Sequence, residues 1–128
     1  MSKKRIHGER NKTLSEKLFS GKTYFDWTVT TAFYSVIHFV EDEVLPCSIN
    51  DKECKNINDV KKAYKLKGRH AAREKLVQNK MSINASISYK WLDDKSRYAR
   101  YTTYKVTTSE AEKAKRCLDV IYKECPSN

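Results

Sequence analysis

The sequence predicts an all-α protein, an antiparallel up-and-down bundle of four principal helices plus a short extra helix. Three observations support this fold class: a long apolar stretch with helical periodicity at residues 24–45, further segments with three- and four-residue apolar spacing, and connections marked by Gly, Pro and polar residues. A chain of 128 residues, 39% of them hydrophobic and 33% charged, has room for one core. We therefore expect a single domain spanning residues 1–128.

Residues 24–45 are the predicted central helix. Apolar side chains recur there at helical steps, at Phe25, Val29, Ala32, Phe33, Val36, Ile37, Val40 and Val44. This spacing places them on one stripe of a helix. A pair of strands is the alternative, because Val, Ile, Thr and aromatic residues favour strands. Strict two-residue alternation is absent, however, and the first helix breaker is Pro46.

Helices are also expected on both sides of this stretch. Thr13 and Glu16 fit a capping box, so the first helix should be firmest over 14–20, and Gly21 fits a left-handed C-cap. Polar, turn-forming residues make 46–58 the longest expected loop and the most mobile segment.

Three helical segments are expected in the second half of the chain. A turn of helix around Val60, Ala63 and Tyr64 precedes Gly68, and a short helix follows that glycine. A second long helix is expected from Met81 to Tyr104, with its apolar side formed by Ile83, Ile87, Trp91, Tyr98 and Tyr101 and with Leu92 and Ala99 close by. The last helix should run from about Ser109 to Glu124, with Thr108 or Ser109 as its cap and Ala111, Ala114, Cys117, Leu118 and Val120 or Ile121 buried.

The N-terminal residues contain no apolar run of the kind that a signal peptide needs, and the central helix carries too many charges for a membrane span. We therefore expect a cytoplasmic protein without a membrane partner. The four cysteines, at positions 47, 54, 117 and 125, do not have zinc-site spacing and are expected to be reduced structural thiols, with a disulfide or a metal as the weaker alternatives. No cofactor and no metal are expected.

The net charge of +10 is unevenly distributed. Residues 1–23 carry seven positive and two negative side chains, residues 24–54 carry one positive and six negative, and residues 55–80 carry nine positive and two negative. Clustered basic charge favours a polyanionic partner such as RNA or a nucleotide. A solvated surface that only aids solubility is the alternative.

His70 and Arg73 form the first candidate site, inside the most basic segment. Residues three apart share a helix face. An imidazole exchanges protons near neutral pH, and a guanidinium binds phosphate through two hydrogen bonds. Such a pair suits RNA cleavage through the ribose 2′-hydroxyl. The alternative is an ordinary first helical turn whose side chains face solvent or a carboxylate.

A polar stripe on the second long helix is the next candidate, formed by Tyr89, Asp93, Arg97, Arg100 and Tyr104. Asp93 and Arg97 fit a helical ion pair, whereas the arginines and tyrosines also suit phosphate capture and base stacking. On the central helix, Tyr34, His38 and Asp42 follow one another at one-turn steps. His38 fits either a hydrogen-bonded core residue or a proton-transfer group whose tautomer Asp42 fixes.

Three segments, YFDWTVTTAFYSVIHFVEDEVL, RHAAREKLV and YKWLDDKSRYARY, together resemble the HEPN superfamily, and the resemblance covers about residues 14–124. It implies a helical bundle, frequent dimerisation, and roles around RNA in defence, stress or toxin–antitoxin systems. Many members resemble metal-independent endoribonucleases with an R-x4–6-H motif completed across a dimer. No arginine of this chain precedes a histidine at that spacing, so residue roles are assigned here by chemistry.

The leading hypothesis is therefore a HEPN-like domain that engages RNA or a nucleotide, as a metal-independent endoribonuclease and a homodimer with an operon-encoded protein partner. Its candidate catalytic residues are His70, Arg73, His38 and Arg97. Its candidate nucleic-acid-binding residues are Lys65, Lys67, Arg69, Arg100, Tyr101 and Tyr104. The alternative is a non-catalytic helical interaction module, a dimeric partner protein with a basic surface.

Overall fold

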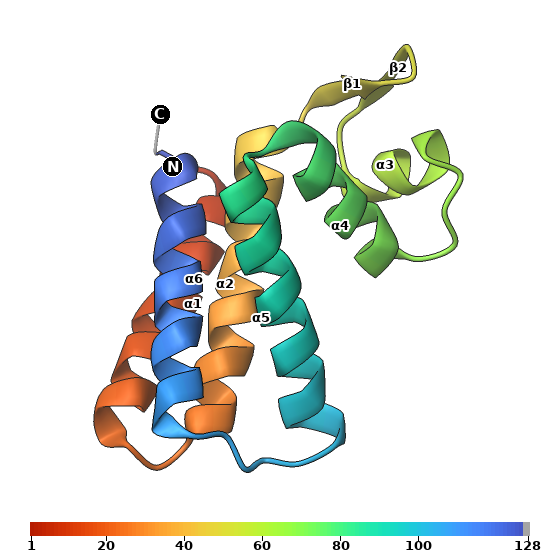
Figure 1. Cartoon of the computed structure of the whole chain (residues 1–128). Coiled ribbons are helices and arrows are strands. Elements are labelled where there is room, and N and C mark those ends of the chain that lie inside the picture. The colour runs from red at the N-terminus through yellow and green to blue at the C-terminus, as the bar shows by residue number, and fades with distance from the viewer. Residues whose placement is uncertain (127–128) are drawn as a thin grey trace.

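The computed structural model describes residues 1–126, which form six helices and one small hairpin (Figure 1). The four long helices are α1 (Lys3–Gly21), α2 (Phe25–Val44), α5 (Ile83–Tyr101) and α6 (Thr108–Glu124). Successive long helices run antiparallel, so α1 begins and α6 ends at the same end of the bundle (Figure 1). The predicted all-α up-and-down bundle is confirmed.

α2 is the central helix, and it packs against α1, α5 and α6. The middle of its apolar stripe is fully buried, with 0% exposure at Val29, Ala32, Phe33, Val36, Phe39 and Val40, while Phe25 and Val44 at its ends are half-buried. Leu92 of α5 and Leu118 and Ile121 of α6 close the same core. A hydrophobic stripe at helical period thus buries itself against three neighbours, as the sequence pattern predicts.

The contact between α1 and α2 depends on small and polar residues. Gly8 lies directly against the buried ring of Phe39, and its carbonyl accepts a hydrogen bond of 2.8 Å from Ser35 Oγ. One end of the contact is closed by a second hydrogen bond of 2.8 Å, from Ser15 Oγ to the carbonyl of Thr28. The missing Cβ at Gly8 allows the two helices to approach closely.

Both expected ends of the first helix differ from the structure. α1 begins at Lys3, where the Ser2 side chain accepts a hydrogen bond of 3.0 Å from the backbone N–H of Arg5, so the cap is Ser2 and not Thr13. At its other end the left-handed residue is Lys22, with φ of 58°, and Gly21 belongs to the helix. The N-terminal half of α1 is helical because it packs against α2, and this tertiary contact is not contained in the helix propensities of its residues.

The segment after α2 is ordered structure and not the expected irregular loop. β1 (Cys47–Ile49) and β2 (Lys52–Cys54) form an antiparallel hairpin in which Cys47 faces Cys54. Its two turn residues, Asn50 and Asp51, both have positive φ, 50° and 64°, which is the geometry of a tight type I′ turn. The Asn50 side chain also donates a hydrogen bond of 3.1 Å to the carbonyl of Ala63, which ties the hairpin to the next helix.

The two short helices, α3 (Ile57–Ala63) and α4 (Arg69–Lys80), lie between the hairpin and α5 (Figure 1). They share a second, smaller core formed by Ile49, Cys54, Ile57, Val60, Ala63, Ala72 and Leu76. The structure places α4 beside both α2 and α5. Ion pairs tie α4 to both neighbours, from Arg73 to Glu41 of α2 and from Glu74 to Lys90 of α5.

The predicted apolar side of α5 is mostly exposed: Trp91 packs against the core, and the neighbouring Leu92 and Ala99 are buried, but the other four residues are not. The apolar residues Ile83, Ile87, Tyr98 and Tyr101 are 79%, 64%, 42% and 81% exposed. The buried side carries the large residues Tyr89 and Leu92 among small or polar ones, namely Ala85, Ser88, Asp93, Ser96 and Ala99. The small side chains let α5 lie close to α2 while Tyr89 and Leu92 fill the core between the helices.

α6 begins one residue earlier than expected. Thr107 is its N-cap and forms a reciprocal capping box with Glu110, so neither Thr108 nor Ser109 is the cap. Of the two candidate core positions, Ile121 is buried at 0% exposure.

All four cysteines are free thiols. None of the helices formed by the described residues combines the length and the apolar character that crossing a bilayer requires.

Candidate histidine–arginine site

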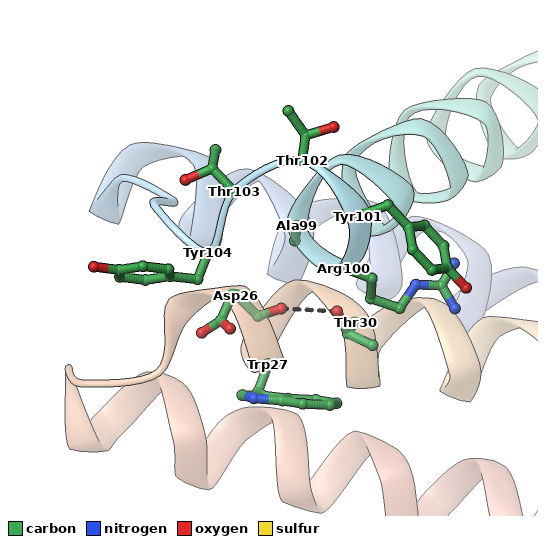
Figure 2. A pocket seen from close by; sticks show the side chains of 9 residues that line it. All are labelled: Asp26, Trp27, Thr30, Ala99, Arg100, Tyr101, Thr102, Thr103 and Tyr104. Carbon is green, nitrogen blue, oxygen red and sulfur yellow. Dashed lines mark hydrogen bonds between the residues drawn. The ribbon is translucent and has the colours of Figure 1, made fainter.

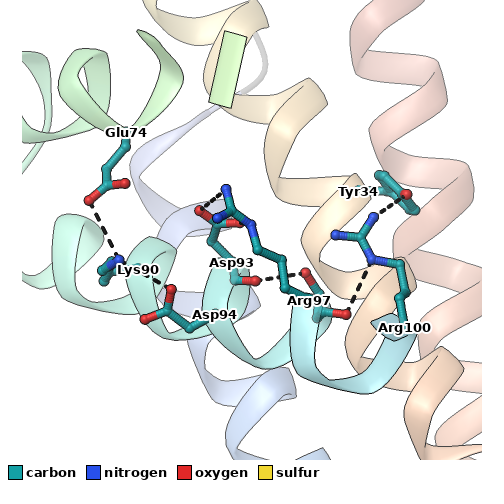
Figure 3. A network of polar contacts seen from close by, with 8 residues as sticks. Tyr34, Glu74, Lys90, Asp93, Asp94, Arg97 and Arg100 are labelled. Carbon is teal, nitrogen blue, oxygen red and sulfur yellow. Dashed lines mark hydrogen bonds and ion pairs between the residues drawn. The ribbon is translucent and has the colours of Figure 1, made fainter. Parts of the chain in front are cut away.

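A group of polar side chains from α2, α4 and α5 gathers on one side of the bundle. We call it the histidine–arginine face, and it comprises Tyr34, His38, His70, Arg73, Arg97 and Arg100. Figure 3 shows its α5 portion, in which Arg97 runs back to Asp93, one turn earlier on α5, while Arg100 reaches Tyr34 of α2. The α4 helix is tied to α5 by Lys90, whose Nζ lies 3.8 Å from Glu74 Oε1 and 3.1 Å from Asp94 Oδ1.

His70 lies in the first turn of α4, near three guanidinium groups. Partial burial lowers the pKa of its imidazole, and the positive charge of Arg97 lowers it further, as do Arg73 and Arg100. The nearby carboxylate of Asp93 acts in the opposite direction but does not outweigh them. The imidazole is therefore mostly neutral near pH 7 and able to accept a proton.

Arg73 is anchored by Glu41 of α2. Its Nε donates to Glu41 Oε2 at 2.7 Å, while Lys4 of α1 donates to Glu41 Oε1 at 2.8 Å. Burial alone would raise the pKa of Glu41, but the hydrogen bonds from Lys4 and Arg73 outweigh it, and the pKa lies below its ordinary value. The carboxylate stays ionised, and both Nη groups of Arg73 remain without a partner among residues 1–126.

Arg97 is held by Asp93, one turn earlier on α5. Its Nε lies 3.0 Å from Asp93 Oδ1, although the hydrogen-bond geometry is met only between Nη2 and Oδ2, at 3.3 Å. Asp93 is 1% exposed, and the hydroxyl of Tyr89, buried in the same region, makes no hydrogen bond within the described chain. Burial raises the pKa of Tyr89, so this hydroxyl stays protonated.

Arg100 has no carboxylate partner within residues 1–126. Its Nε donates to the carbonyl of Ser96 at 3.2 Å, and its Nη1 donates to the Tyr34 hydroxyl at 2.6 Å (Figure 3). The cations around the face are Lys4, Arg73, Arg97 and Arg100, and its carboxylates are Glu41 and Asp93. Positive charge is therefore in excess, which suits an anionic ligand.

His38 stacks on His7 of α1, with ring centroids 4.0 Å apart and an interplanar angle of 24°. Burial lowers the pKa of His38, and the neighbouring His7 lowers it further. The expected pairing with Asp42 is not formed, because Asp42 accepts a hydrogen bond from the Ser2 hydroxyl instead. His38 is therefore held by stacking between α1 and α2.

The predicted catalytic residues His70, Arg73, His38 and Arg97 all belong to this one face. The predicted nucleic-acid-binding residues divide into three groups. Arg100 belongs to the face, and Arg69 precedes His70 in the first turn of α4. Lys65 and Lys67 lie on the connection between α3 and α4, which Figure 1 places on the side of α4 away from α5, and Tyr101 and Tyr104 lie at and just after the end of α5. Sequence proximity to His70 does not bring these two lysines into the face.

Tyr101 and Tyr104 line a pocket of about 480 Å³ at the C-terminal end of α5, next to Arg100. We call it the aromatic pocket, and Figure 2 shows its walls: Asp26, Trp27 and Thr30 of α2 opposite Arg100, Tyr101 and Tyr104. The Arg100 guanidinium lies 5.4 Å from the Tyr34 ring centroid and 5.3 Å from that of Tyr101. Arg100 therefore connects the pocket with the histidine–arginine face.

Sequence reasoning missed several of these residues. His7 and Lys4 precede residues 14–20, the part of the first helix that the sequence marks as firmest, and Glu41 reads as one of several acidic residues at the end of α2. Glu41 lies three residues after His38 and so shares its helix face, which was the available signal. Asp26 and Trp27 gave no comparable signal, since their pocket is completed by residues far along the chain.

The described residues contain no group of three or more His, Cys, Asp or Glu side chains placed to hold a metal ion. Comparisons of the chain with protein-family models, with curated proteins and with solved structures find no match.

Proposed function

We propose that this protein is a HEPN-like RNA-engaging domain that cleaves RNA at the histidine–arginine face without using a metal ion. The observation that carries the proposal is the anchoring of three arginines on one face, Arg73 by Glu41, Arg97 by Asp93 and Arg100 by Tyr34, whose charges act on the imidazole of His70. The HEPN resemblance suggests a defence or toxin–antitoxin setting, with the protein acting as a homodimer or beside an operon-encoded partner.

In the proposed reaction, the 2′-oxygen of a ribose attacks the adjacent phosphorus and the bond to the 5′-oxygen breaks. The products are a 2′,3′-cyclic phosphate and a 5′-hydroxyl end. His70 accepts the proton of the 2′-hydroxyl, a role that its lowered pKa favours near pH 7. The departing 5′-oxygen takes a proton from solvent, and His38 acts as a supporting group.

The arginines supply the electrostatic part of the reaction. Arg73 and Arg97 are each anchored on one edge by a carboxylate, and Arg100 by Tyr34 and a backbone carbonyl. Each guanidinium keeps at least one Nη group without a partner among residues 1–126, and these groups fit the oxygens of a phosphate.

The test is cleavage of a structured RNA in the presence of EDTA by the wild type and by His70→Gln. We expect cleavage by the wild type with 2′,3′-cyclic phosphate ends and a loss of about 100-fold or more in the variant, the usual contribution of a positioned general base. The rate should rise with pH through a value below 6.5, because the pKa of His70 lies below its ordinary value. Equal rates for the two proteins at matched helicity would contradict the assignment.

Phosphate contact is tested with a matched pair of charge changes. Arg100→Gln removes a cation from the face, whereas Arg116→Gln removes one from an exposed position on α6. We expect the first to weaken RNA binding and to reduce the slope of log affinity against log salt by about 1, and the second to change neither. Equal effects of the two variants would show that only overall charge matters.

A non-catalytic interaction module is the second candidate function, favoured by the apolar stripe that α5 presents outward. Ile83 and Ile87, 79% and 64% exposed, lie one turn apart on it. Exposed apolar patches of this kind mark protein contacts. If the protein neither binds nor cuts RNA at low salt, and Ile87→Glu abolishes a self-association seen by light scattering, this function replaces the first.

A further inference from the structure

The aromatic pocket combines flat apolar walls with one carboxylate. Trp27, Tyr101 and Tyr104 are 52%, 81% and 72% exposed, which is unusual for side chains of this size. Asp26 lies between Trp27 and Tyr104 in Figure 2, and its carboxylate makes no ion pair or hydrogen bond with residues 1–126. Asp26 lies in the first turn of α2, where the helix dipole favours a negative charge, and no cation of residues 1–126 neutralises it.

The arrangement of the pocket residues indicates which class of ligand the pocket would hold. Exposed aromatic rings beside a guanidinium are the usual surroundings of an unpaired base, which stacks on the rings while its phosphate meets the cation. The pocket volume of about 480 Å³ is ample for a base with its ribose. Arg100 is available for the phosphate because it lies on the wall shared with the histidine–arginine face.

The Asp26 carboxylate discriminates among the bases. Guanine presents two adjacent N–H donors, N1–H and the N2 amino group, which match the two oxygens of a carboxylate. Adenine and cytosine each place an acceptor nitrogen beside their amino donor, and uracil flanks its single N–H with two carbonyl oxygens. Those acceptors repel a carboxylate, so guanine alone forms the two-bond contact.

We propose that the aromatic pocket binds an unpaired guanine of single-stranded RNA, stacked on Trp27 and Tyr104 and held by Asp26. This inference rests on the proposed function and names its substrate preference. Arg97 and Tyr101 lie four residues apart on α5, a rise of about 6 Å along the axis. The pocket therefore selects a guanine close to the phosphate that is cleaved at the histidine–arginine face.

The experiment measures binding of oligouridylates of about ten nucleotides that carry a single central G, A or C, at low salt. We expect the G-containing strand to bind about 5- to 10-fold more tightly than the others, at the lower end of what a two-bond contact provides. Its binding should quench tryptophan emission in the wild type and not in Trp27→Phe, which keeps an aromatic ring at that position. Trp91, the other tryptophan, remains in both proteins as an internal reference.

Two Asp→Asn substitutions distinguish the effect of the pocket carboxylate from the effect of a change in net charge. Asp26→Asn should bring the G-containing strand to within about twofold of the other strands, whereas Asp119→Asn, on the exposed side of α6, should preserve the preference. Binding without a guanine preference, a preference unchanged in Asp26→Asn, or quenching that persists in Trp27→Phe would overturn the pocket assignment and leave the proposed function intact. If none of the strands binds, the proposed function and the pocket assignment both fail.

Discussion

Gly8→Ala tests the close contact between α1 and α2. A Cβ at this position would lie 2.7 and 2.8 Å from two carbons of the Phe39 ring. The ring has no room to withdraw, because it is 0% exposed, lies 4.7 Å below the Arg5 guanidinium and packs at 5.0 Å against the Tyr122 ring. The substitution therefore forces overlap inside a closed core.

The magnitude follows from two opposing effects. Replacing glycine by alanine inside a helix stabilises it by about 0.5–1 kcal/mol, whereas overpacking a closed core costs about 1–3 kcal/mol. With two ring carbons nearer than 3.0 Å, the cost at Gly8 belongs near the upper end. We expect a net loss of about 2 kcal/mol in the free energy of unfolding and a fall of about 6–10 °C in Tm.

Urea denaturation followed by circular dichroism measures this loss, and two further variants provide the controls. Gly21→Ala lies in the same helix with no atom within 4 Å of its new Cβ, so it should stabilise the protein by up to about 1 kcal/mol. Phe39→Leu removes the ring edge and should make Gly8→Ala much less costly in the double variant. A Gly8→Ala protein as stable as the wild type, or the same cost in both backgrounds, would refute the close-contact argument.

Two further outcomes follow from the titrating groups. The pKa of Glu41 lies below its ordinary value of 4.5. Its contribution to stability is therefore present above pH 4.5 and is lost as the pH falls through the folded-state pKa. When the free energy of unfolding is measured at decreasing pH, it should decline less in Glu41→Gln than in the wild type. Burial raises the pKa of the Cys125 thiol to about 12 and also raises that of Cys54, so iodoacetamide at about pH 8 should label half-buried Cys47 in the native protein and reach Cys54 and Cys125 only in urea. Rapid native labelling of Cys125, read by peptide mass spectrometry, would show that this end of the bundle opens.

The fold class was predictable because the sequence of α2 has a clear helical pattern. Its apolar residues recur at helical steps over five turns, and a helix with such a stripe has to be covered. The hairpin was predictable in principle from Asn50-Asp51, a pair that favours left-handed turns, but its strands have only three residues each. Elements that short leave almost no periodicity to read.

The orientation of α5 shows what periodicity does not encode. The spacing of Ile83 and Ile87 correctly indicates a helix, yet the face that meets α2 carries Ala85 and Ala99. A small side chain permits close approach but contributes little to a hydrophobic pattern. The start of α1 was not predicted for the same reason: its contact residue with α2 is Gly8, which has no side chain to contribute to a hydrophobic pattern.

The sequence predicted which residue types form the site but not how they are arranged in space. Spacing placed His70 and Arg73 on one side of α4, whereas their proximity to Arg97 depends on how α4 lies across α5. Pairing with Glu41 and Asp93 depends on the same packing. Long-range placement of this kind follows from tertiary contacts, which a single sequence does not reveal.

The two carboxylates explain how a basic face can be ordered in the absence of a ligand. Glu41 is 8% exposed and Asp93 1% exposed, and a buried charge is stable only when it is paired. Each therefore holds a guanidinium by one edge and leaves at least one of its Nη groups without a partner among residues 1–126. Long arginine side chains lose conformational entropy when they are fixed, about 0.5–1.5 kcal/mol for each one immobilised on binding. Here most of that ordering accompanies folding, so a phosphate would meet preorganised donors. Removing Glu41 should for this reason weaken anion binding at the face, although it removes a negative charge.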